Sequence, residues 1–261
     1  MKYGVLVISH GSRDAEWVRL VDEAVEAVRL PGDVPVFSSY LELVDGRLIQ
    51  DGIDELERQG ATDLIVVPFF VSSGSTHVDE IMWALGVTEE PKRETDLEPF
   101  RVAARLHPCP PMDDDPDVAQ ILWEKLQAAS VDPARELLLL VGHGSNEKGF
   151  HKAWREGMLK LAERVRALGG FAKADIAMLL PNQAPCKMKL AARRHPELTV
   201  VVAPLFISDG YFTRAVIPER LAGYSYRYSG QAMLPHPLLS RWMERQIAAY
   251  LDSAASNDDT A

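Results

Sequence analysis

The sequence is poor in cysteine, with only Cys109 and Cys186 among its 261 residues. These two form neither a Cys-x-x-Cys pair nor the framework of bridges that staples small secreted domains. A composition that is 47% hydrophobic and 25% charged also excludes a mostly disordered chain and is typical of a globular protein. A soluble protein of the reducing cytoplasm is therefore the expected class.

Long apolar runs are also missing. No uninterrupted apolar stretch approaches the ~20 residues that span a bilayer. The first residues run directly into the short apolar segment Val5–Ile8, without the longer apolar region and cleavage site of a secretory signal. We expect no membrane association and no export.

Positive charge is in deficit, with 28 basic against 38 acidic residues and a net charge of −10. This balance argues against a nucleic-acid binder, which needs a concentrated basic face. The deficit lies in residues 1–130, which hold 11 basic and 25 acidic residues, whereas residues 131–261 hold 17 and 13. A mildly basic second half could face an anionic ligand, although solvated surface charge is the favoured explanation of the asymmetry.

The two halves of the sequence resemble each other. The segment Val5–Ser12 recurs as Leu138–Ser145, and Leu64–Val71 recurs as Thr199–Ile207. A repeat at this distance indicates a duplicated domain, because solenoid repeats are far shorter.

Apolar runs of strand length alternate with amphipathic segments in both halves, which is typical of βα units on parallel sheets. The expected strands lie near residues 3–9, 35–41, 63–71, 100–105, 136–142, 173–179, 198–206 and 230–234. The expected helices lie near residues 14–29, 46–59, 75–86, 116–129, 147–168, 184–195, 212–222 and 236–252. We predict an α/β fold of two similar tandem domains, each a mainly four-stranded parallel sheet flanked by helices. Their expected bounds are 1–130 and 131–252, followed by a flexible tail over 253–261.

Three polar residues follow the first three expected strands. They are His10, Glu42 and His77. Proteins with open parallel sheets bind their ligands at the carboxyl ends of the strands, which is where these three residues are expected to lie. Two imidazoles and a carboxylate suit a divalent ion such as Co²⁺, Fe²⁺, Ni²⁺ or Zn²⁺, and a neutral imidazole can also act as a base. Each residue alone also fits a helix cap or a solvated first-turn side chain, but their shared position favours one functional site.

The repeat provides an internal control. His143 corresponds to His10, whereas Leu179 falls opposite Glu42 and Thr213 opposite His77. The second half therefore lacks two of the three polar residues. We expect one complete site in the first half, with the second half as a degenerate repeat that serves as a wall, lid or platform of the substrate cleft.

The sequence resembles the class II tetrapyrrole chelatases, namely the sirohydrochlorin cobaltochelatase and ferrochelatase family in its long, duplicated form. The resemblance rests on the strand followed by His10-Gly11-Ser12, on Glu42 and on the stretch 67–81, and it covers nearly the whole chain. It implies a lyase that inserts Co²⁺ or Fe²⁺ into sirohydrochlorin for cobalamin or sirohaem synthesis, with Ni²⁺ as a further option and no other cofactor.

The resemblance also implies roles for the three residues. His10, Glu42 and His77 would hold the metal, and His10 and His77 would be catalytic, one of them accepting a pyrrole proton. The sequence does not show which of the two histidines accepts the proton.

Sirohydrochlorin bears eight carboxylates, so its pocket should present cations and hydrogen-bond donors. Candidates by location are Ser12, Arg13, Ser73, Ser75, Thr76, His143 and Arg214. A helix-capping or solvated role is the alternative for each.

Two other functions compete. A non-catalytic metal or tetrapyrrole carrier would use the same ligands, and a histidine phosphatase is disfavoured because Ser9 stands where an arginine is needed. Neither a Gly-x-Ser-x-Gly nucleophile elbow nor a glycine-rich nucleotide motif occurs. A monomer is expected, because one duplicated chain joins two halves that a single-domain relative would pair as a dimer.

Overall fold

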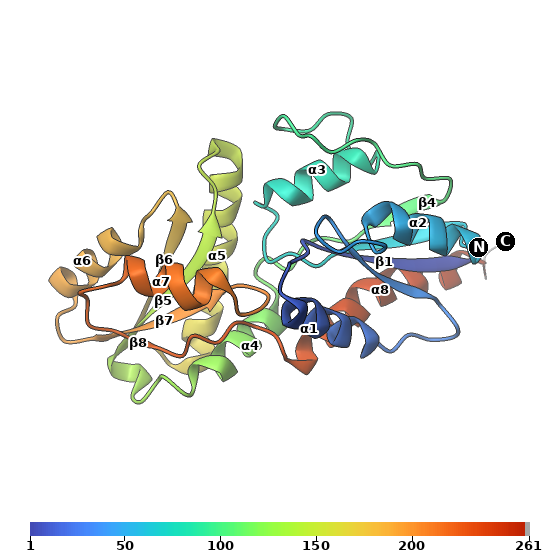
Figure 1. Ribbon diagram of the computed structural model, residues 1–261. Helices are drawn as coiled ribbons and strands as arrows, with labels where there is room; N and C mark the ends of the chain where they lie inside the picture. The colour runs from blue at the N-terminus through green and yellow to red at the C-terminus, as the bar shows by residue number, and fades with distance from the viewer. Residues whose placement is uncertain (259–261) are drawn as a thin grey trace. The chain divides into compact units, whose positions relative to one another are not determined.

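The computed structural model describes residues 1–258, which divide into two compact units. Unit 1 comprises residues 1–70, 76–111 and the chain from Pro237 onwards, and unit 2 comprises residues 71–75 and 112–236. Each unit is a parallel α/β layer structure (Figure 1). The predicted α/β fold with two similar four-stranded domains is thus confirmed.

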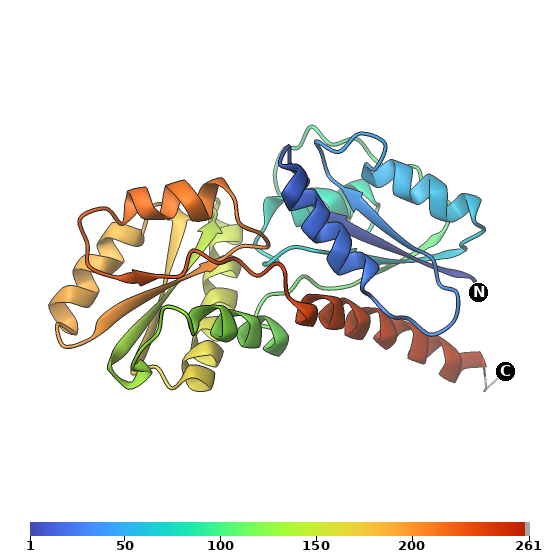
Figure 2. The ribbon, with the colours of Figure 1, turned by 60° about the horizontal axis from the view of Figure 1, so that its bottom comes forward.

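Unit 1 has the strand order β2-β1-β3-β4, with every neighbouring pair parallel. Its elements are β1 (Tyr3–Ser9), α1 (Ala15–Glu26), β2 (Val36–Tyr40), α2 (Ile49–Arg58), β3 (Asp63–Pro68), α3 (Thr76–Ala84), β4 (Arg105–Pro108) and α8 (Pro237–Asp258). Helices α2 and α3 cover one face of the sheet and α1 and α8 the other (Figures 1 and 2).

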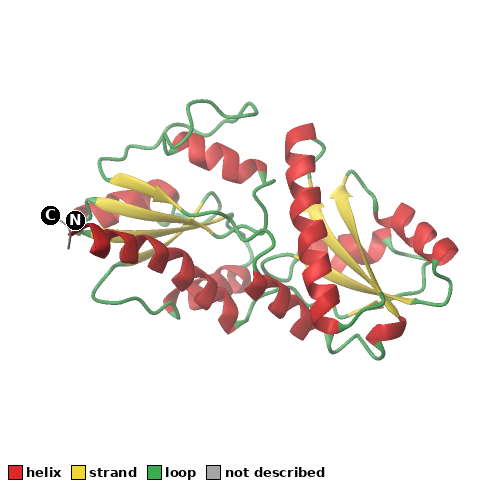
Figure 3. Cartoon of the chain, turned by 180° about the vertical axis from the view of Figure 1, so that it is seen from behind, coloured by secondary structure: helices red, strands yellow, loops and turns green. Residues whose placement is uncertain are grey.

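Unit 2 repeats this arrangement with the strand order β6-β5-β7-β8, again parallel. Its elements are α4 (Pro116–Leu126), the 3₁₀ turn η1 (Pro133–Arg135), β5 (Glu136–Gly144), α5 (Lys148–Gly169), β6 (Lys173–Leu180), α6 (Ala184–Arg194), β7 (Thr199–Leu205), the π-helical turn η2 (Phe212–Val216), α7 (Ile217–Arg220) and β8 (Arg227–Tyr228). Helices flank this sheet on both sides as well (Figure 3).

The central strands are buried on both faces, which explains their unbroken apolar sequence. All four residues of Val5–Ile8 in β1 are inaccessible to solvent, and Leu138–Val141 in β5 are nearly so. In unit 1, Leu6 and Ile8 pack against Ile53 of α2 and Ile81 of α3. The two sheets are therefore rigid cores that hold the loops at their carboxyl ends in place.

The last helix of each half packs on the sheet of the other half, contrary to the sequence-based boundary near residue 131. Helix α8 belongs to unit 1, where Trp242, Met243 and Ile247 are fully buried. The Ser240 hydroxyl there donates to the Ala24 carbonyl oxygen of α1 at 2.7 Å. Helix α4 belongs to unit 2 and packs on α5 and β7. The predicted domains 1–130 and 131–252 are thus wrong in the placement of both helices.

The expected tail over 253–261 begins inside a helix. The backbone of α8 continues through Asp258, because the sequence there contains neither proline nor glycine to end it. Residues 259–261 lie outside the described part of the chain.

The fourth strand of each sheet, β4 or β8, also differs from its predicted position. The segment expected as a strand near 100–105 instead bonds to side chains of α2, since Glu57 accepts hydrogen bonds from the backbone N–H groups of Ala103 and Ala104. The strand β4 begins only at Arg105. The segment near 230–234 likewise follows β8 rather than forming it.

None of the helices in residues 1–258 is both long enough and apolar enough to cross a lipid bilayer.

Candidate functional site

The carboxyl edge of the unit 1 sheet brings the three predicted side chains together. His10 follows β1, Glu42 follows β2, and His77 is the second residue of α3, which follows β3. The Nε2 atom of His10 lies 3.7 Å from Oε1 of Glu42. The rings of His10 and His77 meet edge to face, with their centroids 4.6 Å apart. The sequence-based expectation that these residues converge is met.

Backbone pairing fixes the distance between His10 and Glu42. The backbone N–H of Glu42 donates to the carbonyl oxygen of His10 at 3.1 Å, so the β1–β2 ladder extends past both strands. Between them, Gly11 has a φ of +99°, and a Cβ atom there would overlap the carbonyl oxygen of Glu42. Only glycine allows this approach, which explains the His-Gly pair in the sequence.

A different hydrogen bond orients each imidazole. In His10, Nδ1 lies 3.1 Å from the carbonyl oxygen of Gly11, and in His77, Nδ1 lies 2.6 Å from Oε1 of Glu80. Because a carbonyl or carboxylate oxygen can only accept, Nδ1 carries the proton in both rings. In the neutral form of each ring, Nε2 then has the lone pair that can bind a metal ion or accept a proton.

The site is accessible to solvent. The side chains of His10, Glu42 and His77 are 38%, 54% and 39% exposed. Within residues 1–258, no three or more His, Cys, Asp or Glu side chains are arranged to enclose a metal ion. His10, Glu42 and His77 are close neighbours whose donor atoms do not point to one position. Side-chain rotation must bring these atoms together before they can share a metal ion.

Glu80 and Thr95 complete the surroundings of His77, and the sequence analysis missed both. The hydrogen bond from His77 holds the pKa of Glu80 below its usual range against the opposing effect of partial burial, and the hydroxyl of Thr95 adds to this lowering. Glu80 was detectable, because residues three apart on a helix share a face. Thr95 lies in a loop and gave no such signal.

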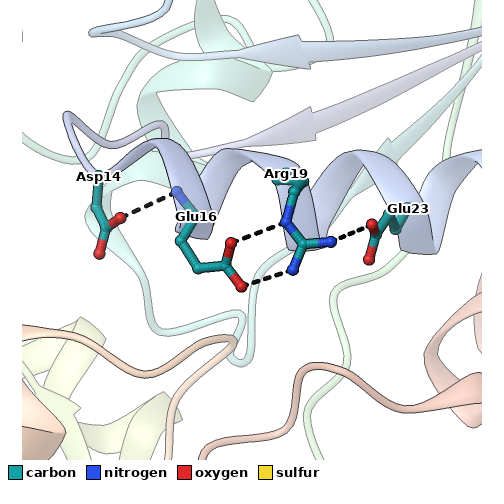
Figure 4. Close-up of polar contacts among 4 residues, drawn as sticks. All are labelled: Asp14, Glu16, Arg19 and Glu23. Carbon is teal, nitrogen blue, oxygen red and sulfur yellow. Dashed lines mark hydrogen bonds and ion pairs between the residues drawn. The ribbon is translucent and has the colours of Figure 1, made fainter.

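The turn after His10 leads directly into α1. The side chain of Asp14 accepts a hydrogen bond from the backbone N–H of Glu16 and so caps this helix, while Arg19 pairs with Glu16 and Glu23 along its exposed face (Figure 4). The cap fixes where the helix begins, whereas the exposed ion pairs add little stability.

The residues proposed for substrate contact occupy varied positions. The hydroxyl oxygen of Ser12 accepts from the backbone N–H of Asp14, and Arg13 is exposed. Ser75 belongs to the segment of unit 2 that precedes α3, and Thr76 begins that helix. The bond at Ser12 is of the local helix-start type, so the structure gives it a structural role.

In unit 2, His143 repeats the local geometry of His10 but has different neighbours. Its Nδ1 lies 3.1 Å from the carbonyl oxygen of Gly144, and its ring meets Phe212 edge to face at 5.1 Å between centroids. Thr213, opposite His77, is buried and bonds to the carbonyl oxygen of Gly210.

The residue opposite Glu42 is Leu180, one position later than the sequence alignment placed it. Gly144 pairs with Leu180 in the β5–β6 ladder, and a Cβ atom at Gly144 would meet the carbonyl oxygen of Leu180 just as one at Gly11 would meet that of Glu42. The alignment with Leu179 was therefore wrong by one residue. Unit 2 still lacks a carboxylate at this point.

Comparisons with known proteins agree with this fold. The chain is 24% identical over 221 residues to sirohydrochlorin ferrochelatase of Priestia megaterium, covering 82% of this chain and 77% of that protein. Among solved structures it is similar to SirB from Bacillus subtilis with Fe³⁺, at a TM-score of 0.71, 17% identity and 95% coverage of both chains.

A second similar structure is the sirohydrochlorin chelatase SirB from Bacillus subtilis subspecies spizizenii in complex with cobalt. Its TM-score is 0.67 at 16% identity, with 95% of this chain and 94% of that chain covered. The model of the CbiX family matches residues 4–129 and again residues 137–250. The two matches confirm the duplication, and the chain belongs to the CbiX family.

Proposed function

We propose that this protein inserts Co²⁺ or Fe²⁺ into sirohydrochlorin. The observation that carries the proposal is the pair of imidazoles, His10 and His77, each with its Nδ1 atom bonded to an oxygen, beside the carboxylate of Glu42. Family membership supports it, as do the relative named as a ferrochelatase and the similar structures described with iron and cobalt.

The chemistry of insertion matches what these side chains can do. A divalent ion must be held while it loses part of its hydration shell, and two pyrrole N–H protons must leave the macrocycle. His10, His77 and Glu42 supply two neutral nitrogen donors and one anionic oxygen donor, a set that suits first-row divalent ions. An imidazole that gives up the ion has the same lone pair free to accept a pyrrole proton.

The exposure of the site also fits a large, flat substrate. Side chains that are 38% to 54% exposed leave room for a macrocycle to approach the ion directly, which a deeply buried site would prevent. The metal is here a substrate that must be released, and donor side chains that are open to solvent are consistent with release.

The test is an absorbance time course of sirohydrochlorin with Co²⁺, Fe²⁺ or Ni²⁺. We expect multiple turnovers for the unaltered protein and at least a hundredfold loss in His10→Ala, His77→Ala and Glu42→Ala. His195→Ala is the control, because it removes an imidazole outside the candidate site. His195 follows α6 in unit 2, and its Nδ1 atom lies 3.7 Å from Oε1 of Glu197. Stoichiometric binding of metal or pigment without turnover would instead establish a carrier.

A further inference from the structure

A long loop over residues 85–104 connects α3 to β4 and is tied back to α3 by two adjacent carboxylates. Asp79 accepts a hydrogen bond from the backbone N–H of Lys92 at 2.7 Å. Glu80 accepts one from the hydroxyl of Thr95 at 2.6 Å. A loop of this length without secondary structure is uncommon in a compact domain.

Of these two carboxylates, Glu80 also contacts a residue of the candidate site. Its Oε1 atom accepts the Nδ1–H of His77 at 2.6 Å, while its Oε2 atom accepts the Thr95 hydroxyl. Each oxygen of the carboxylate thus has one donor. The side chain is 22% exposed, so it is held from two sides in a partly buried position.

We propose that Thr95 and Glu80 are positioning residues that hold His77 as the Nδ1–H tautomer with its Nε2 lone pair directed to the substrate metal ion. The inference rests on the proposed function for the identity of that ion. A carboxylate bonded to the far nitrogen of a ligand histidine fixes the ring orientation and increases its strength as a donor. Thr95 fixes the carboxylate in turn, so the loop acts on the site through a chain of two hydrogen bonds.

The two site histidines therefore differ in how they are held. The orienting acceptor of His10 is the backbone carbonyl oxygen of Gly11, which no side-chain substitution removes. The acceptor of His77 is a side chain supported by a loop residue. We expect substitutions at Glu80 and Thr95 to weaken the His77 donor while leaving the tautomer of His10 unchanged.

The test combines the tautomer of each histidine with the affinity for Co²⁺, measured in the full-length protein without tetrapyrrole. Long-range ¹H–¹⁵N correlation spectra distinguish a protonated Nδ1 from a protonated Nε2. We expect a protonated Nδ1 at His77 in the unaltered protein and loss of this single state in Glu80→Leu. The Co²⁺ affinity of Glu80→Leu should fall about 10- to 100-fold.

Three further variants give an expected order. Glu80→Gln keeps an oxygen that can accept a hydrogen bond from His77, so its Co²⁺ affinity should fall less than that of Glu80→Leu. Thr95→Val keeps the shape of the side chain without its hydroxyl, and its Co²⁺ affinity should fall a few-fold. Asp79→Asn is the matched control, because Asp79 ties the same loop to the same helix without contacting His77, and its affinity should stay within about twofold.

An unchanged His77 tautomer in Glu80→Leu would overturn the inference, as would equal losses in Asp79→Asn and Thr95→Val. The nitrogen signals of His10 and His107 report whether each variant is folded. Failure of the proposed function is a separate result: a tautomer that depends on Glu80 in a protein that never metallates sirohydrochlorin would refute the chelatase alone.

Discussion

At the scale of single residues, Gly11 determines how closely the backbones of His10 and Glu42 approach. Its φ of +99° is one that other residues adopt only with strain, and the carbonyl oxygen of Glu42 occupies the space that a side chain would need. The separation of the two polar side chains is therefore set by a residue that contributes no functional group.

Replacing Gly11 with alanine should destabilise the protein by about 3 kcal/mol, from backbone strain and overlap together. Gly86→Ala is the matched control, because Gly86 has a φ of +73° with nothing within 4 Å of the added carbon, and strain alone costs about 1 kcal/mol. Urea unfolding measures both values. Equal losses in the two variants would show that the overlap with Glu42 is relieved at no cost.

Glu136 is a buried carboxylate with several partners at the start of β5. It is 1% exposed, and it accepts hydrogen bonds from the Ser130 hydroxyl, the backbone N–H groups of Val131 and Asp132, and the guanidinium of Arg227. Burial raises the pKa of Glu136, but these hydrogen bonds and the charge of Arg227 outweigh burial and bring the pKa below its usual range.

The lowered pKa of Glu136 gives a defined pH dependence. A carboxyl group whose pKa is lower in the folded than in the unfolded state stabilises the fold above its unfolded pKa of about 4.3, and this contribution disappears as the pH falls through the folded pKa. Glu136→Gln should therefore cost about 2 kcal/mol at pH 7, with a gap to the unaltered protein that narrows below pH 4. Urea unfolding at pH 7, 5 and 3.5 tests this, and a gap independent of pH would contradict it.

Much of the candidate site was predictable because parallel strands place their carboxyl ends at one edge. That rule was sufficient to group His10, Glu42 and His77 without coordinates. The rule did not predict that Thr95 lies near the site, because a loop residue is positioned by contacts with residues distant in sequence. It also misaligned Leu179, since register between the repeats depends on backbone pairing that leucine-rich segments do not reveal.

At the scale of secondary-structure elements, the helices α4 and α8 are the informative pair. Both are amphipathic, and both follow the fourth strand of their half, so the same pattern fits packing on either sheet. The apolar face of α8 fits the unit 1 sheet, where Trp242 lies 6.1 Å from Phe69 between ring centroids. The sequence predicted that these helices exist but contained no sign of which sheet they cover.

The Trp242→Ala substitution should destabilise unit 1 by about 3–5 kcal/mol, because it leaves a large cavity under α8. Trp242→Phe keeps an aromatic ring and should cost less than half of this. Hydrogen exchange followed by mass spectrometry should show faster exchange in α1, β3 and α8 than in β5 and β7. An equal acceleration in both units would refute the assignment of α8 to unit 1.

At the scale of the whole molecule, neither unit is a continuous piece of the chain. Unit 1 needs residues from Pro237 onwards, and unit 2 needs residues 71–75 in addition to residues 112–236. The sequence repeat breaks near residue 131 and so does not mark the structural boundary. A repeat in sequence shows that a duplication occurred, whereas the packing of its last helices is decided by apolar surfaces in three dimensions.

A polypeptide of residues 1–130 should not fold, because it lacks α8 and carries α4 without the unit 2 helix α5 and strand β7 on which α4 packs. Adding residues 131–261 as a separate chain should restore structure, since both exchanged helices are then present. Circular dichroism and urea unfolding measure this. Cooperative unfolding of residues 1–130 alone would show that unit 1 is complete without α8.

The placement of α8 also sets an order for synthesis on the ribosome. Domains usually fold as they emerge, beginning with the amino-terminal one, but unit 1 holds the first strand and also the last helix. Its sheet must wait for α8, whereas unit 2 has all its elements once residue 236 has left the ribosome. The unit that carries His10, Glu42 and His77 therefore begins before unit 2 in the chain but needs a helix made after it, so we expect its sheet to be complete only once α8 has left the ribosome.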